Sequence, residues 1–219
     1  MEIVPVGDTT LIVRLGTFPD DTSASLAALR RLQNAKLRGV IEIAPAYNTL
    51  GVFYDAAEVG FGELAKEIEA AVAHTSTSGS AAPARVIEIP VCYGGEFGPD
   101  LDDVAKHTGL TGDDVIARHS AAEYVVSCVG FTPGFPYLSG LPNELSIPRR
   151  ATPRKQVPAG SVAIGGAQTG VYPTSSPGGW HLIGRTRLRL FDVQQNPPAL
   201  LQAGDCVRFR VISRDEFEA

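Results

Sequence analysis

The sequence predicts an α+β protein with two domains, a small α/β domain at the N-terminus and a larger domain composed mostly of β-strands. Helix-period and strand-period patterns alternate in the N-terminal part, whereas short β-rich runs separated by glycine and proline dominate the C-terminal part. Between these parts, residues 75–84 are small and polar and lack hydrophobic periodicity, which is typical of a linker. We therefore predict domains at residues 1–80 and 81–219.

The N-terminal domain is predicted to begin with a hairpin and a helix. Apolar segments at 3–5 and 10–15 flank a Gly-Asp turn, which favours a β-hairpin. The following segment carries leucines at helical spacing. We expect Ser23 or Ser25 to cap this helix and Gly39 to end it.

The rest of this domain reads as two strands and a second helix. Residues 40–44 and 50–54 are β-rich, and a single apolar stripe marks the helix that follows. That stripe consists of Phe61, Leu64, Ala65, Ile68 and Val72. If residues 86–91 supply the next strand, the result is a split β-α-β arrangement of ferredoxin-like type, with both helices on one face of an antiparallel sheet.

The C-terminal domain is predicted to start with two short helices and to continue as strands and turns. Pro99 is suited to open the first helix, and residues 111–114 resemble a capping box for the second. Residues 124–129 favour a strand. Alternating runs at 188–193 and 206–212 predict the last strands, so the domain is expected to be a β-barrel or a sandwich.

Composition excludes several classes of function. A net charge of −5 argues against generic binding to nucleic acid or to anionic membranes, both of which need widely distributed basic residues. The three cysteines are far apart and form no zinc-binding pattern, so neither disulfides nor a metal site is predicted. The start lacks a signal-peptide pattern, and no apolar run approaches the ~18 residues of a membrane span. We expect a cytoplasmic protein.

Residues 131–187 form the most unusual stretch of the chain. They contain nine of its 23 glycines and eight of its 16 prolines, without any period. Aromatic residues and short β-type runs at 161–164 and 180–183 argue against disorder, which such a composition would otherwise suggest. We predict an ordered surface of turns and short strands. Residues 131–137 are rigid and aromatic, which suits either a pocket wall or a surface that docks another protein chain.

The same stretch is locally cationic. Six basic residues stand against the single acid Glu144: Arg149, Arg150, Arg154, Lys155, Arg185 and Arg187. Guanidinium groups bind carboxylate and phosphate, and glycines let backbone N–H groups approach a ligand, so a site for a small anion is predicted. The alternative is that some of these arginines lie on a solvated face.

Common catalytic signatures are missing from the sequence. Gly165 and Gly166 follow an apolar run and suit either a phosphate cradle or a tight turn. His181 can serve as an acid or base, or as a packing residue beside Trp180. Ser176 can donate a hydrogen bond to a substrate, or it can build the turn that the neighbouring prolines enforce.

Five strings in this region and before it resemble the B subunit of the bacterial ATP-dependent 5-oxoprolinase, a family also described as allophanate hydrolase subunit 1. They are IPVCYGG at 89–95, GFTPGFPYL at 130–138, PAGSVAIGG at 158–166, QTGVYP at 168–173 and SPGGW at 176–180. The resemblance covers nearly the whole chain. It implies that the C-terminal domain is a cyclophilin-like β-barrel, and similar domains form the carboxyltransferase portion of urea carboxylase.

The resemblance also implies a reaction and partners. With a homologous C subunit, which resembles allophanate hydrolase subunit 2, and with a separate A subunit, such a protein opens the lactam of 5-oxoproline to L-glutamate. The resemblance implies that ATP, with Mg²⁺, is a substrate, and that no organic cofactor is bound. Combined with the anion-site argument, the resemblance predicts substrate binding by Arg149, Arg154, Lys155, Gln168, Tyr172 and Ser176. It further predicts nucleotide binding at Gly165 and Gly166 and proton transfer by His181, in a site shared with the C subunit.

The family also includes an inhibitor of a sporulation histidine kinase. A regulatory binding protein that uses the same barrel as a docking surface is therefore the alternative function. Both kinds of member share the strings quoted above, so the strings leave that choice open.

Overall fold

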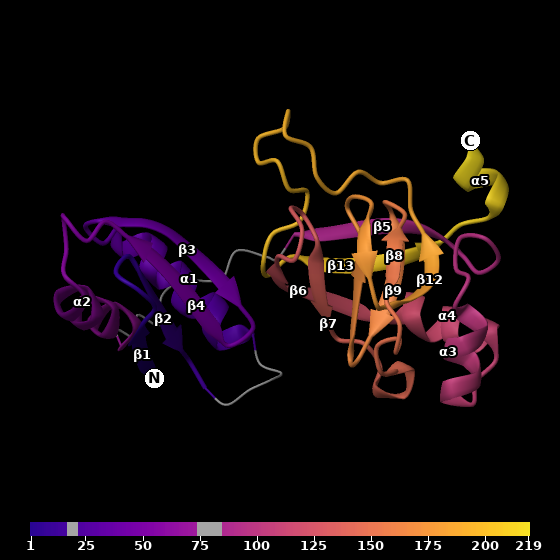
Figure 1. Cartoon of the computed structure of the whole chain (residues 1–219), viewed down its shortest axis with the longest axis horizontal. Coiled ribbons are helices and arrows are strands. Elements are labelled where there is room, and N and C mark those ends of the chain that lie inside the picture. The colour runs from indigo at the N-terminus through magenta and orange to yellow at the C-terminus, as the bar shows by residue number, and fades with distance from the viewer. Residues whose placement is uncertain (17–21, 74–84) are drawn as a thin grey trace. The chain divides into compact units, whose positions relative to one another are not determined.

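A computed structural model describes residues 1–16, 22–73 and 85–219, and the chain divides into two compact units, Met1–Pro83 and Ala84–Ala219 (Figure 1). The described residues form a mixed α/β structure that contains a closed seven-stranded β-barrel. The segment predicted as a linker, residues 75–84, lies outside the described residues.

The first unit is an antiparallel four-stranded sheet with two helices. In spatial order the strands are β1 (Glu2–Pro5), β2 (Thr10–Arg14), β4 (Thr49–Tyr54) and β3 (Val40–Ala46), and the helices are α1 (Ser23–Ala35) and α2 (Phe61–Ala73). Alternate strand residues such as Leu11, Val13 and Val52 are fully buried, together with Leu32 of α1 and Leu64 of α2. Strand alternation and the helical stripe thus meet in one core.

Two predictions about this unit are wrong in detail. The strand predicted at 86–91 forms, but as β5 (Val86–Tyr93) it pairs with β12 and β13 of the barrel, while β1 takes the place beside β2. A hairpin closes over a short loop at little entropic cost, which favours β1 in that position. The predicted ends of the first helix are also wrong. The N-cap of α1 is Thr22 and not Ser23 or Ser25, and the helix ends before Lys36, which has a left-handed φ of 48°, and not at Gly39.

The barrel is closed in the order β10-β7-β6-β13-β5-β12-β9, and only β13 and β5 are parallel neighbours. Its strands are β5, β6 (Glu123–Val129), β7 (Pro136–Ser139), β9 (Ser161–Gly165), β10 (Gln168–Val171), β12 (His181–Arg185) and β13 (Cys206–Val211). The other elements of this unit are α3 (Leu101–Thr108), α4 (Gly112–Ala121), η1 (Asn143–Leu145), β8 (Arg154–Val157), β11 (Ser176–Gly178) and α5 (Arg214–Glu218). Figure 1 shows α3 and α4 packed together beside the barrel.

The capping box predicted at the start of α4 is confirmed, because Asp114 N–H donates to Thr111 Oγ1 at 3.1 Å and the Asp114 carboxylate accepts from Thr111 N–H. The strands predicted at 124–129 and 206–212 are also present. The prediction of a strand at 188–193 is wrong. Apart from a bridge at Phe191, the backbone of this segment bonds to the loop that follows it, through Asp192 N–H to Pro198 O and Leu200 N–H to Leu190 O.

Strand β9 is buried along its whole length because a hydrophobic core lies on each of its faces. Val162 and Ile164 belong to the core inside the barrel, whereas Ala163 belongs to a second, aromatic cluster. That cluster consists of Phe135, Val157, Ala163, Tyr172, Trp180 and Leu182. The continuous apolar run in the sequence therefore indicates a strand that is buried on both faces, as in other sheets with both faces covered.

A chain of polar groups crosses the barrel interior at His119, which is fully buried on α4. Thr169 donates its hydroxyl hydrogen to Ala163 O at 3.0 Å, so Thr169 Oγ1 accepts from His119 Nε2 at 2.9 Å. His119 Nδ1 then accepts from the Tyr93 hydroxyl at 2.8 Å. Burial lowers the pKa of His119 to about 3 and raises the pKa of Tyr93, which keeps both groups neutral.

No helix among the described residues combines the length and the apolar character needed to cross a membrane. The three cysteines, Cys92, Cys128 and Cys206, are not joined by disulfide bonds.

Candidate functional site

The aromatic cluster outside the barrel opens into a cavity of about 290 Å³, here called the aromatic pocket. Its lining residues are Phe131, Phe135, Tyr137, Arg149, Arg150, Pro153, Tyr172, Pro177, Gly178, Gly179 and Trp180. All of them belong to the glycine- and proline-rich stretch that the sequence singles out. Turns bring them together, since they come from strands and loops that are far apart in that stretch.

Phe135 is the centre of the pocket wall. Its ring centroid lies 5.0 Å from Tyr137, 5.1 Å from Tyr172 and 5.6 Å from Trp180, each in an edge-to-face arrangement. Such contacts are favourable because the positive edge of one ring meets the negative face of another. The wall is therefore held rigidly before any ligand binds.

Phe131 and Arg149 border the pocket. Phe131 has a left-handed φ of 67° and is 59% exposed, and strained, exposed side chains of this kind concentrate at functional sites. The Arg149 guanidinium lies 5.8 Å from the Trp180 ring centroid and is held by cation–π attraction. No acid among the described residues lies within ion-pair distance of Arg149, so it remains available to an anionic ligand.

Asp100 holds two further arginines near the pocket, Arg150 and Arg154. Its buried carboxylate accepts from Arg150 at 2.8 Å, from two nitrogens of Arg154 at 2.7 Å, and from Leu182 N–H at 2.7 Å. Burial alone would raise the pKa of Asp100, but the hydrogen bonds from Arg154 and Leu182 and the charges of Arg154 and Arg150 lower it below its usual value. The ionised carboxylate joins the start of α3 to β8, β12 and the Arg150 loop.

Sequence reasoning missed both Asp100 and His119. Asp100 follows Pro99 at the predicted start of a helix, and an aspartate at that position ordinarily reads as a solvated cap. Its two arginine partners are separated from it by 50 and 54 positions in the chain, a separation that no local pattern reports.

The predicted substrate-binding residues do not all lie together. Arg149 and Tyr172 line the aromatic pocket, and burial raises the pKa of Tyr172, so its hydroxyl stays protonated. Arg154 is engaged by Asp100, and Lys155 is exposed beside it on β8. Gln168 lies on β10, outside the pocket lining. Ser176 has a buried hydroxyl for which the described residues provide no partner.

The predicted nucleotide-binding glycines have other tasks in the structure. A Cβ on Gly165 would lie 2.6 Å from the Trp180 ring, so Gly165 provides the flat surface against which Trp180 packs. Gly166 exchanges both backbone hydrogen bonds with Ile147, at 2.7 and 3.2 Å. Its N–H group is thus occupied, and the alternative of a tight turn fits Gly166, whose φ is +65°.

His181 is buried on β12 next to the pocket rather than in its lining. Its Nε2 lies 3.1 Å from Pro148 O, and its Nδ1 has no hydrogen-bond partner among the described residues. With Asp100 and Asp103 it forms a group of possible metal ligands, but two arginines already neutralise Asp100. A cation is therefore disfavoured there.

Replacing Gly165 with alanine is expected to destabilise the second unit by about 2 kcal/mol, because the added methyl group must displace Trp180 or shift β9. Trp180 is the only tryptophan, so intrinsic fluorescence reports this movement directly. Gly60→Ala, at a position where no atom lies within 4 Å, is the control and should leave the emission spectrum unchanged. An unchanged spectrum for both variants would contradict the close packing of Trp180 on Gly165.

Comparison with known proteins identifies the class to which this fold and pocket belong. The family model for the carboxyltransferase domain, subdomain C and D, matches residues 1–201. Two relatives from Bacillus subtilis and Haemophilus influenzae, both named as the B subunit of 5-oxoprolinase, are 43% and 48% identical to the chain. The alignments cover 100% and 96% of this chain and 95% and 98% of the relatives. The chain belongs to the family of 5-oxoprolinase B subunits.

Two solved structures with the same fold are longer than this chain. The crystal structure of TTHA0988 is 36% identical, with a TM-score of 0.80 over 94% of this chain and 40% of that one. The Kluyveromyces lactis urea carboxylase has a TM-score of 0.77 over 99% of this chain and 22% of its own. At 19% identity, this second likeness concerns the fold alone.

Proposed function

We propose that this chain is the B subunit of a multi-subunit, ATP-dependent 5-oxoprolinase, which cleaves 5-oxo-L-proline to L-glutamate with hydrolysis of ATP. The observation that carries the proposal is the identity of 43% and 48% over nearly the full length of relatives with that name. We further propose that the first unit is a ferredoxin-like variant, that the barrel is cyclophilin-like, and that the protein works in the cytoplasm.

The aromatic pocket supports binding of a small ring that carries a carboxylate. Aromatic rings can cover the faces of a lactam ring, and Arg149 at the border can bind its carboxylate. The protonated hydroxyl of Tyr172 can donate to the lactam oxygen. Lactam opening is difficult because an amide resists water. Transfer of the γ-phosphoryl group of ATP to the lactam oxygen, with release of ADP, would create a better leaving group, and Mg²⁺ would neutralise the charge of the transferring group.

We propose that a homologous C subunit completes the site and that the A subunit is a further component of the complex. The chain offers an open pocket with one unpaired guanidinium, and its described residues assemble no set of nucleophile, base and oxyanion donors there. The roles proposed for Lys155, Gln168 and Ser176 in substrate binding, and for His181 in proton transfer, stay predictions. So does nucleotide binding at Gly165 and Gly166.

Inhibition of a histidine kinase is the alternative function, and the names of the relatives do not favour it. The deciding experiment mixes the purified chain with the A and C subunits, 5-oxoproline, ATP and Mg²⁺, and measures glutamate. Glutamate formation that requires every component is expected. Absence of glutamate together with inhibition of kinase autophosphorylation would favour the alternative.

In the reconstituted complex, Arg149→Ala is expected to raise KM for 5-oxoproline about tenfold, because a charge-assisted hydrogen bond to the carboxylate is lost. Arg118→Ala removes a similarly exposed arginine that pairs with Glu144 on another face, and it should leave KM unchanged. Equal KM values for both variants would remove Arg149 from the substrate site.

A further inference from the structure

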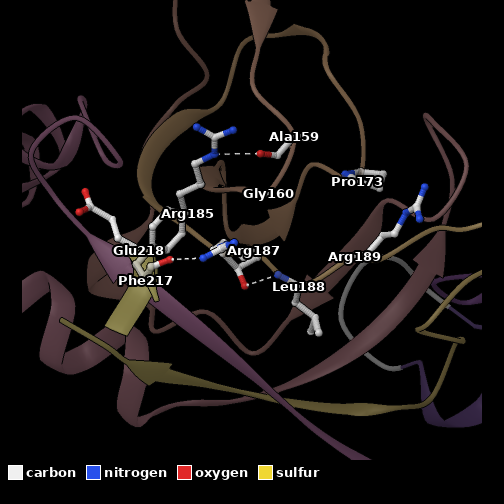
Figure 2. A pocket seen from close by; sticks show the side chains of 10 residues that line it. Ala159, Gly160, Pro173, Arg185, Arg187, Leu188, Arg189, Phe217 and Glu218 are labelled. Carbon is white, nitrogen blue, oxygen red and sulfur yellow. Dashed lines mark hydrogen bonds between the residues drawn. The ribbon is translucent and has the colours of Figure 1, made fainter. Parts of the chain in front are cut away.

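A second cavity lies on the same unit, between the end of β12 and the helix α5 (Figure 2). It has a volume of about 660 Å³ and is here called the arginine pocket. Its lining residues are Ala159, Gly160, Pro173, Arg185, Thr186, Arg187, Leu188, Arg189, Phe217 and Glu218. None of them lines the aromatic pocket, and none has a place in the function proposed above.

The cavity owes its charge to one alternating segment, Arg-Thr-Arg-Leu-Arg-Leu at 185–190. Thr186 and Leu190 are buried, while the arginines between and beside them are more accessible. Arg185, Arg187 and Arg189 alternate in the chain with these less accessible positions. Figure 2 shows all three arginine side chains bordering the same cavity.

Arg185 and Arg187 are not neutralised by acids. Arg185 Nε donates to Ala159 O at 3.0 Å, and Arg187 NH1 donates to Phe217 O at 3.0 Å. Across the described ranges, neither guanidinium has a carboxylate within 4 Å, in contrast to Arg150 and Arg154. The backbone carbonyls orient the two groups and leave their remaining N–H donors for a ligand.

The other charges of the pocket are already paired. Arg189 NH1 lies 3.0 Å from Asp192 Oδ2, and Glu218 Oε1 lies 2.7 Å from Arg214 Nε. The pocket therefore carries a net positive charge from two oriented guanidiniums. Leu188 and Phe217 add apolar surface beside them.

We propose that the arginine pocket binds a linear oligophosphate group. Two guanidiniums that line one cavity without a carboxylate partner fit a ligand whose charge is spread over successive groups, whereas a single carboxylate can engage only one of them. The cavity is also large enough for a nucleoside triphosphate, whose base can lie on Leu188 and Phe217. Free inorganic triphosphate and the phosphate chain of ATP are the two sources of this chemistry.

Binding is measured on this chain alone, by calorimetric titration with inorganic triphosphate, ATP, orthophosphate and 5-oxoproline at low and physiological salt. We expect triphosphate and ATP to bind at least tenfold more tightly than orthophosphate, and 5-oxoproline not to compete. Affinity should fall as salt rises, since the contacts are between accessible charges. Tighter binding of ATP than of triphosphate would identify a nucleotide as the ligand of the arginine pocket. Equal binding would identify free inorganic triphosphate as its ligand.

Arg185→Ala and Arg187→Ala should each weaken triphosphate binding about tenfold, with the lysine variants retaining an intermediate affinity. Arg208→Ala is the matched control, because Arg208 is an exposed arginine on β13 that pairs with Glu123 away from the pocket. Asp192→Asn should tighten binding several-fold by releasing Arg189, and its amide oxygen can still accept from Gln194 N–H.

Far-UV circular dichroism and thermal melting establish that each variant is folded before titration. The proposal is overturned if the folded wild-type chain binds no triphosphate at millimolar concentration, or if the Arg185 and Arg187 variants bind it as tightly as Arg208→Ala does. The glutamate assay of the reconstituted complex tests the proposed function separately, so either proposal can fail without the other.

Discussion

Asp100→Asn is expected to destabilise the second unit by about 3 kcal/mol. The substitution removes the negative charge that two arginines surround. It leaves Arg154 without an ionic partner and Arg150 with only the exposed Asp103 at 3.9 Å. Side-chain exposure of 3% at Asp100 means that water cannot replace the lost interaction. Urea unfolding at pH 7, followed by circular dichroism, measures this loss.

Asp103→Asn is a matched control on the same helix. Asp103 lies 3.9 Å from the same arginine, but its side chain is 64% exposed, so its loss should cost less than about 1 kcal/mol. Asp100→Asn should also alter Trp180 fluorescence, because Arg150 and Pro153 line the aromatic pocket. Equal stability of the two variants would show that Asp100 is not the centre of this network.

The same network changes how the activity of the Arg154→Ala variant is interpreted. From the sequence, this substitution is expected to abolish lactam opening while leaving assembly intact. In the structure Arg154 donates two hydrogen bonds to Asp100, so a loss of activity in this variant also reflects a loosened pocket wall. Arg149 is the cleaner test of anion binding, because no described carboxylate is paired with it.

The stability of the chain is expected to fall by about 2 kcal/mol between pH 7 and pH 5 because of His119. Burial lowers the pKa of His119 from 6.5 to about 3 in the folded protein, whereas the unfolded chain takes up a proton near pH 6.5. The unfolded state therefore binds more protons throughout this interval. Stability present above pH 6.5 is lost progressively as the pH falls toward 3.

Urea titrations at both pH values, for the wild type and His119→Gln, measure this effect. Glutamine can still bond to Tyr93 and Thr169 but takes up no proton, so its pH dependence should be smaller by about 2 kcal/mol. His107→Gln, at an exposed position on α3, should retain the wild-type dependence. A wild-type slope in His119→Gln would place the titrating group elsewhere.

Part of the site can be predicted from the sequence because its signals are local. The rigid, aromatic residues 131–137 suit either a pocket wall or a docking surface, and Phe135 and Tyr137 line a pocket in the structure. A capping box spans four residues, and strand alternation spans five or six, so α4 and β13 follow from short windows. The cationic character of residues 131–187 is likewise a matter of composition.

The division of the arginines could not be predicted in this way. Whether a guanidinium is neutralised depends on a carboxylate that folding brings to it, and Asp100 reaches Arg154 across 54 positions of the chain. The same is true of Gly165, for which the sequence allows either a phosphate cradle or a tight turn, and which packs under Trp180 in the structure. The pairing of β5 with strands of the barrel, and not with the first sheet, is a third case.

The sequence by itself determined the α+β composition, most of the strands and helices, the family resemblance and the concentration of glycine, aromatic and basic residues in one stretch. Only the tertiary structure decided which charges are paired, which rings form a pocket and which glycines serve packing. The physical reason is range: hydrogen-bonding and hydrophobic periods act between near neighbours in the chain, whereas burial and ion pairing depend on groups that become neighbours only when the barrel closes.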